Sequence, residues 1–183
     1  MSADVHSVTQ LAAPVRAALA ATLQQVAQVG AVHAYPRHVA TPEALCDLYT
    51  VTIDGTPQLR GWTVARVSQA ETEPFSGGCS VLCGWELHGV MALEDSAQGA
   101  LAFDDWLDAV CAVLREDDTL GGAVHSLFPG TLRVVTGERD SGSAAVMPSG
   151  LLVPEIGCEV FAGVLCRSVR LNLVTRTVLQ RQA

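Results

Sequence analysis

The sequence of residues 80–93 is SVLCGWELHGVMAL, and its alternation decides the expected fold class. Trp85 and Leu87 alternate with Glu86 and His88. A period of two predicts a β-strand with one apolar and one polar face. The sequence therefore predicts a half-buried strand here, with its apolar side turned toward a core.

A second strand is predicted at residues 60–72, immediately before this one. The intervening residues 73–78 read EPFSGG, a proline- and glycine-rich segment typical of a hairpin tip. The two strands and the tip together predict a long β-hairpin. Further strands are predicted at residues 31–35, 131–138 and 159–179.

Three helices are predicted around these strands. The clearest spans residues 96–115, capped by Asp95 or Ser96, with its buried stripe formed by Phe103, Trp106, Leu107, Val110 and Leu114. Another spans residues 14–29. A short helix follows Thr41, with Pro42 in its first turn, although residues 49–53 also suit a strand. The order α-β-α-β-β-α-β-β predicts one α+β domain over residues 1–183, with helices packed on a mainly antiparallel or mixed sheet.

Composition and charge narrow the classes of function. The chain has 183 residues, 49% of them hydrophobic and 16% charged, with a net charge of −8, and all its basic residues are arginine. An acidic chain without a basic cluster is a poor binder of nucleic acid or anionic membranes. No apolar stretch suits a membrane span or signal peptide. We therefore expect synthesis in the cytosol, no membrane association and a surface partly covered by partner subunits.

The residue patterns give no catalytic, metal or cofactor site. Phosphate-loop and nucleophile-elbow motifs are missing, and the six cysteines form no Cys-x-x-Cys pair. A thiol–imidazole pair of Cys111 with His88 or His125 has no support from spacing, because Cys111 falls in the apolar part of a helix. The acidic group Asp104, Asp105 and Asp108 fits an exposed helix face better than a cation site.

Five segments spread over the chain resemble the tail terminator-like minor tail proteins of tailed bacteriophages and prophages: VRAAL at 15–19, RGW at 60–62, WELHGV at 85–90, DDTLGG at 117–122 and FAGVLC at 161–166. The resemblance implies a structural virion protein in the phage tail, assembled in the host cytoplasm. Its subunits would form a homo-oligomeric ring, commonly a hexamer, that ends polymerisation of the tail tube protein and joins the tail to the head–tail connector protein. DNA would pass through the ring without sequence-specific binding. The alternatives are another head–tail joining or neck subunit and, from a different class, a small cytosolic enzyme.

Two loops are the candidate docking segments. The hairpin tip at residues 73–78 offers Glu73 and Phe75, an acidic residue beside an aromatic one. The loop at residues 139–150 is polar at its start and apolar near its end, and offers Arg139, Asp140 and Met147. The competing interpretation is that both loops are solvated connections without a role in assembly.

Overall fold

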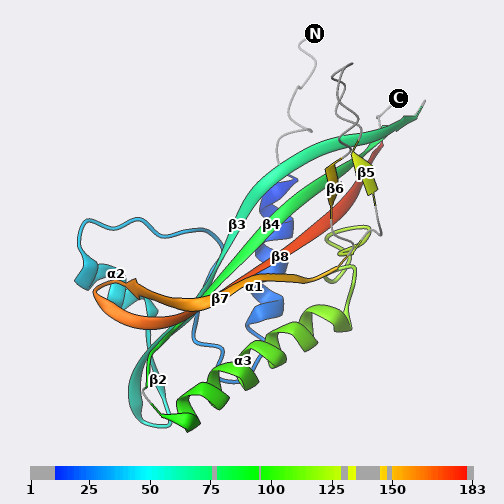
Figure 1. Cartoon of the computed structure of the whole chain (residues 1–183). Helices are drawn as coiled ribbons and strands as arrows, with labels where there is room; N and C mark the ends of the chain where they lie inside the picture. Colours follow the sequence, from blue (N-terminus) through cyan, green and yellow to red (C-terminus); the bar gives the residue numbers. More distant parts are fainter. Residues whose placement is uncertain are drawn as a thin grey trace.

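The computed structural model describes residues 11–75, 78–94, 96–128, 132–134, 145–147 and 150–180. Over these residues the protein is α+β, with helices packed on a mixed six-stranded sheet (Figure 1). The main path of the sheet is β1-β3-β4-β8-β7, and β2 pairs with β3 beside it. The predicted fold class is confirmed.

The predicted long hairpin forms the centre of the sheet. It consists of β3 (Thr56–Phe75) and β4 (Gly78–Ala92), which pair antiparallel from Arg60↔Met91 to Phe75↔Gly78. Both strands are longer than predicted, so Glu73 and Phe75 belong to the backbone of β3 rather than to a loop. A bulge between Arg66 and Ser68 adjusts the register.

The single strand predicted at residues 159–179 is wrong. The structure has two antiparallel strands there, β7 (Leu152–Phe161) and β8 (Val164–Gln180). They are joined by Ala162 and Gly163, whose φ angles are 52° and 80°. Positive φ at two consecutive residues gives the tight turn that favours a two-residue hairpin. Sequence signals for such turns are Gly, Asn or Asp at the positive-φ positions, and Ala162 is none of these, so the turn was not predicted.

Three shorter strand predictions have mixed outcomes. β1 (Ala31–His33) is present and pairs parallel to β3, and the alternative strand at residues 49–53 is largely β2 (Thr50–Ile53). The strand predicted at residues 131–138 is described only as β5 (Leu132–Val134). It pairs with β6 (Ala145–Met147) in a separate two-stranded sheet.

The helices α1 (Ala12–Leu23), α2 (Pro42–Tyr49) and α3 (Ala97–Glu116) occupy the predicted regions. Thr41 caps α2, and the Ser96 hydroxyl accepts the Gly99 N–H at 2.9 Å at the start of α3; the alternative cap Asp95 lies outside the described residues.

Helix α1 ends six residues before the predicted limit, at Leu23 rather than Val29. The chain tightens into successive turns after α1, which bury Val29 and place its carbonyl 3.2 Å from Trp106 Nε1. The early end of α1 therefore gives the Trp106 indole its acceptor.

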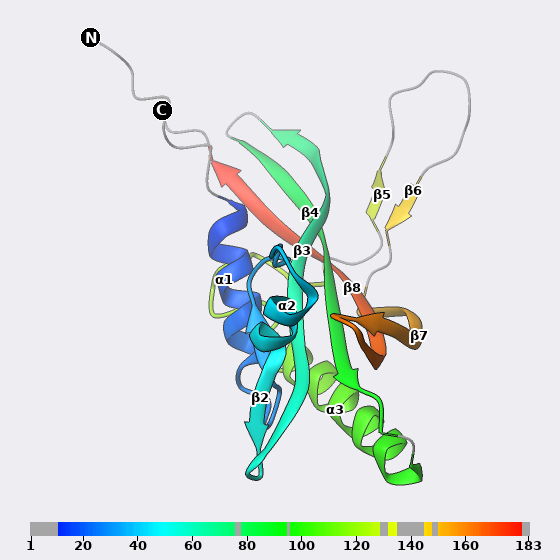
Figure 2. The ribbon, with the colours of Figure 1, turned by 90° about the vertical axis from the view of Figure 1, so that its left-hand side faces the viewer.

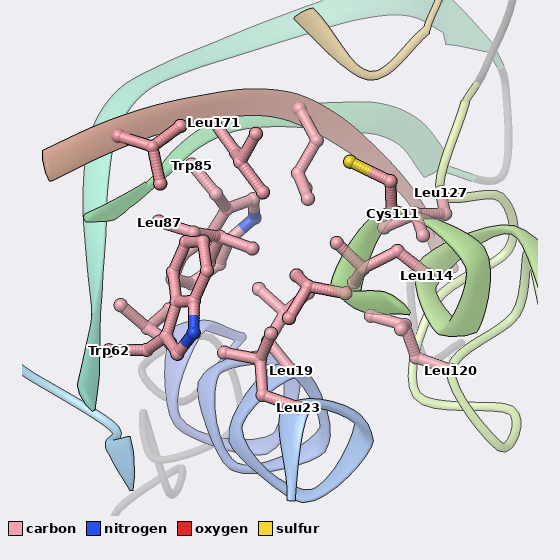
Figure 3. Close-up of a cluster of buried hydrophobic side chains, with 14 of the residues drawn as sticks. Leu19, Leu23, Trp62, Trp85, Leu87, Cys111, Leu114, Leu120, Leu127 and Leu171 are labelled. Atoms are coloured by element: carbon pink, nitrogen blue, oxygen red, sulfur yellow. The ribbon is translucent and has the colours of Figure 1, made fainter. Parts of the chain in front are cut away.

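The main core lies between one face of the sheet and helices α1 and α3 (Figure 3). Alternate residues of β4, including Trp85 and Leu87, point into this core, and the predicted stripe of α3 packs there with them. Trp62 and Trp106 lie at its centre with ring centroids 4.7 Å apart. We call this side the helix face of the sheet. Figure 2 shows α1 on one side of the long strands and β7 on the other.

Candidate functional site

Strand β7 is an open edge of the main sheet: it pairs with β8 on one side and with no described strand on the other. Exposed uncharged side chains lie along its helix face, at Ile156, Cys158 and Val160, and Leu165 lies opposite Val160 on β8. We call these four residues the apolar row. The exposed fractions of Ile156, Val160 and Leu165 are 57%, 72% and 50%.

The buried part of the main core includes residues of β8 but, among the described residues, none of β7. Val169, opposite Ile156, still belongs to the main core. Arg167 lies opposite Cys158, and its guanidinium carbon is 5.8 Å from the centre of the Phe103 ring of α3. An apolar strand edge with free backbone groups is a site where another chain can add a strand.

A polar cluster lies on the opposite face of the same strands. Arg170 Nη1 donates to Glu86 Oε1 at 2.7 Å, and Arg170 Nε lies 3.4 Å from Glu155 Oε2. His88 Nε2 lies 3.1 Å from Glu159 Oε1. Both carboxylates of β7 are therefore held by partners within the chain. Charged side chains at a strand edge oppose pairing with another chain. Here the charges of Glu155 and Glu159 lie on the face opposite the apolar row and contact Arg170 and His88.

Burial lowers the pKa of His88 below its ordinary value of 6.5, and the Arg170 guanidinium acts in the same direction. The carboxylates of Glu159 and Glu86 oppose this effect without outweighing it. The imidazole is therefore neutral near pH 7, and its contact with Glu159 is a neutral–anion contact rather than a full ion pair.

A second open edge lies on the opposite side of the sheet. β1 and β2 pair only with the part of β3 between Thr56 and Thr63. The rest of β3, residues 64–75, has β4 on one side and no described strand on the other. Arg66 and Val67 are exposed there, beside the bulge. The sheet therefore has two different open edges, one at β7 and one at residues 64–75 of β3.

The residues proposed from the sequence as interface contacts are only partly placed. Glu73 and Phe75 lie near the end of β3, and Met147 ends β6, with only their backbone described. Arg139 and Asp140 lie outside the described residues. Their role in an interface stays a prediction.

Sequence reasoning missed the apolar row, although its signal was present. Ile156, Cys158 and Val160 alternate with Gly157 and Glu159, the same period of two that revealed β4. The strand predicted at residues 159–179 begins after Ile156 and Cys158, so the prediction includes no separate edge strand at these residues.

Cys111 and His88, a thiol–imidazole pair that the sequence spacing does not support, are not in contact. Cys111 packs in the main core on the helix face, whereas His88 points to the other side of β4. Burial raises the pKa of the Cys111 thiol, which disfavours a reactive thiolate. Among the described residues, no group of three or more His, Cys, Asp or Glu side chains could hold a metal ion.

Of the helices in the described ranges, none has both the length and the apolar character needed to span a membrane. No protein-family model matches the sequence, and comparison with curated proteins finds no significant match.

Proposed function

We propose that the protein is a tail terminator subunit of a phage-type tail, which forms a ring that ends tail tube polymerisation and joins the tail to the head connector. The observation that carries this proposal is the pair of open, non-equivalent edges on one sheet. Contact between two different surfaces of identical subunits is head-to-tail, and such contacts close into rings when the rotation permits.

The two edges are compatible in direction and length. β3 and β4, β4 and β8, and β8 and β7 each pair antiparallel, so β7 runs opposite to β3. A rotation axis along the strands preserves their directions, so β7 of one subunit would meet β3 of the next as an antiparallel neighbour. The free part of β3 is long enough for all ten residues of β7. Backbone hydrogen bonds would supply the pairing, and the apolar row would lose its contact with water.

The charge of the chain is consistent with this assembly. A net charge of −8 suits a ring through which DNA passes, since binding of the phosphate backbone would impede transit.

The assembly is tested by replacing the apolar row. The double variant Ile156→Arg/Val160→Arg should remain folded and lose ring formation, measured by size-exclusion chromatography with light scattering and by negative-stain microscopy. The matched control is Leu101→Arg on α3, since Leu101 is also an exposed apolar residue, 62% accessible, but lies away from the strand edge. A monomeric wild-type protein, or rings unaffected by the double variant, would contradict the proposed contact.

The role in the tail needs a second experiment. A phage or prophage lacking the gene should produce tails of uncontrolled length without heads, and the wild-type gene should restore tails of normal length. Tails of normal length that fail to join heads would instead assign the protein to the neck.

A further inference from the structure

An open cavity of about 460 Å³ lies between the β2–β3 hairpin, the end of β4 and the first turns of α3. Its apolar wall includes Ile53 and Met91, and Gly99 and Ala102 of α3 also line it. The cavity lies close to the apolar row, because the N–H group of Leu93, which lines the cavity, donates to the carbonyl of Leu165 at 2.9 Å. Helix α3 begins at the same end of the sheet (Figure 1).

Arg60 is the unusual residue of this cavity. Arg60 lines the space, yet it is only 8% exposed. The guanidinium carbon lies 4.9 Å from the centre of the Trp106 ring, and Nε is buried without a hydrogen-bond partner. Within the described chain no carboxylate forms an ion pair with Arg60. A buried cation without a counter-ion is costly, so an anion that enters the cavity gains a strong partner.

Gly99, in the first turn of α3, also lines the cavity, but its N–H group already donates to the Ser96 hydroxyl at 2.9 Å. Arg60 is therefore the charged partner that the cavity offers to an anion. Trp106 is held in place by its hydrogen bond to the Val29 carbonyl, so the surface beneath Arg60 is fixed before any ligand binds.

Two carboxylates restrict which anion fits. Asp54 and Glu94 also line the cavity, and Gln28 Nε2 donates to Asp54 at 3.2 Å. Their negative charges disfavour a doubly charged phosphate more than a singly charged carboxylate. The apolar wall favours a ligand that carries a short hydrocarbon part.

We propose that this cavity binds a small carboxylate with a short apolar chain, whose carboxylate pairs with the Arg60 guanidinium while its chain lies against Ile53 and Met91. The two parts of the ligand thereby match the two parts of the cavity.

The probe for this site is hexanoate, with hexanamide as its uncharged analogue and inorganic phosphate as the competing anion. Binding to the full-length protein is measured by isothermal titration calorimetry and by ligand-observed NMR. Hexanoate should bind with a Kd in the range of about 1 mM or tighter, as expected for one charge-assisted contact with modest apolar burial. Hexanamide and phosphate should bind at least about tenfold more weakly.

Two variants make the test specific. Arg60→Met retains a long side chain over Trp106 but removes the charge, and should abolish hexanoate binding. Ala102→Phe places a ring at the cavity wall without changing Arg60, and should also abolish it. The matched control is Ala109→Phe, at an exposed alanine of the same helix that does not line the cavity, which should bind hexanoate like the wild type.

The proposal is overturned if wild-type protein shows no hexanoate binding, if phosphate binds more tightly than hexanoate, or if folded Arg60→Met binds hexanoate unchanged. If Arg60→Met does not fold, Ala102→Phe against Ala109→Phe decides alone. Ligand binding and ring formation are separate readouts, so a failure of one is distinguishable from a failure of the other.

Discussion

The indole nitrogen of Trp85 on β4 donates a hydrogen bond to the hydroxyl of Thr175 on β8, at 2.9 Å. Both residues are buried, and the strands that carry them are direct neighbours in the sheet. A buried tryptophan needs a partner for its N–H group, because an unsatisfied donor in the core is costly. The register of β4 against β8 therefore satisfies the polar atom of the largest side chain in this part of the core.

Replacing Thr175 with valine should lower the free energy of unfolding by about 1–3 kcal/mol, because the shape is kept and the Trp85 N–H loses its acceptor. Chemical denaturation measures this change. Thr175→Ser keeps the hydroxyl and should cost clearly less. Equal losses in both variants would show that the methyl group of Thr175, not the hydrogen bond, is important.

Replacing Trp106 with alanine should lower the free energy of unfolding by about 3–5 kcal/mol. The indole is buried against Trp62, and its N–H group donates to the Val29 carbonyl, so the variant leaves both a cavity and an unused acceptor. A loss below about 1 kcal/mol in chemical denaturation would show that the stripe of α3 is not packed in the core.

The close approach of Gly89 to Trp62 gives a prediction about backbone space. A Cβ atom at Gly89 would lie 2.7–2.8 Å from three carbons of the Trp62 ring. Gly89→Ala should therefore destabilise the protein by about 1–3 kcal/mol through overpacking. Gly157→Ala in β7 is the control, since a Cβ there meets nothing within 4 Å. Thermal denaturation of the two variants should separate them clearly, and similar melting temperatures would contradict the packing described.

The lowered pKa of His88 predicts a pH dependence of stability. In the unfolded chain the imidazole titrates near 6.5, whereas in the folded protein it resists protonation. The unfolded state therefore binds more protons as the pH falls below about 6.5, and stability should decrease between about pH 6.5 and 5. His88→Gln should reduce this slope in denaturation measured at several pH values.

His33 also has a pKa lowered by burial and contributes in the same direction. The slope that remains in His88→Gln should therefore decrease further when His33→Gln is added. An unchanged slope in the His88 variant would show that this imidazole is not protected from protonation.

Elements with strong local signals could be predicted from the sequence. The stripe of α3 and the alternation of β4 each occur within one segment, and both elements formed where they were expected. The cap at Ser96 was also readable, since a hydroxyl before a helix accepts its free N–H groups.

Relationships between distant segments could not be read in this way. The parallel pairing of β1 with β3 depends on Gly61, which allows the backbone of Ala31 to approach closely. The early end of α1 leaves the carbonyl of Val29 free to accept a hydrogen bond from Trp106, which lies 77 residues further along the chain. The open edge of β7 appears only once its pairing with β8 is known.

The turn at Ala162 and Gly163 sets which way β7 presents its side chains. Because successive residues of a strand point to opposite faces, one residue inserted in this turn would exchange the two sides of β7. Ile156 and Val160 would then replace Glu155 and Glu159 beside Arg170 and His88. The two carboxylates would move to the helix face of the sheet, where the apolar row now lies. Changes in the length of this two-residue connection should therefore be tolerated far less than substitutions within it.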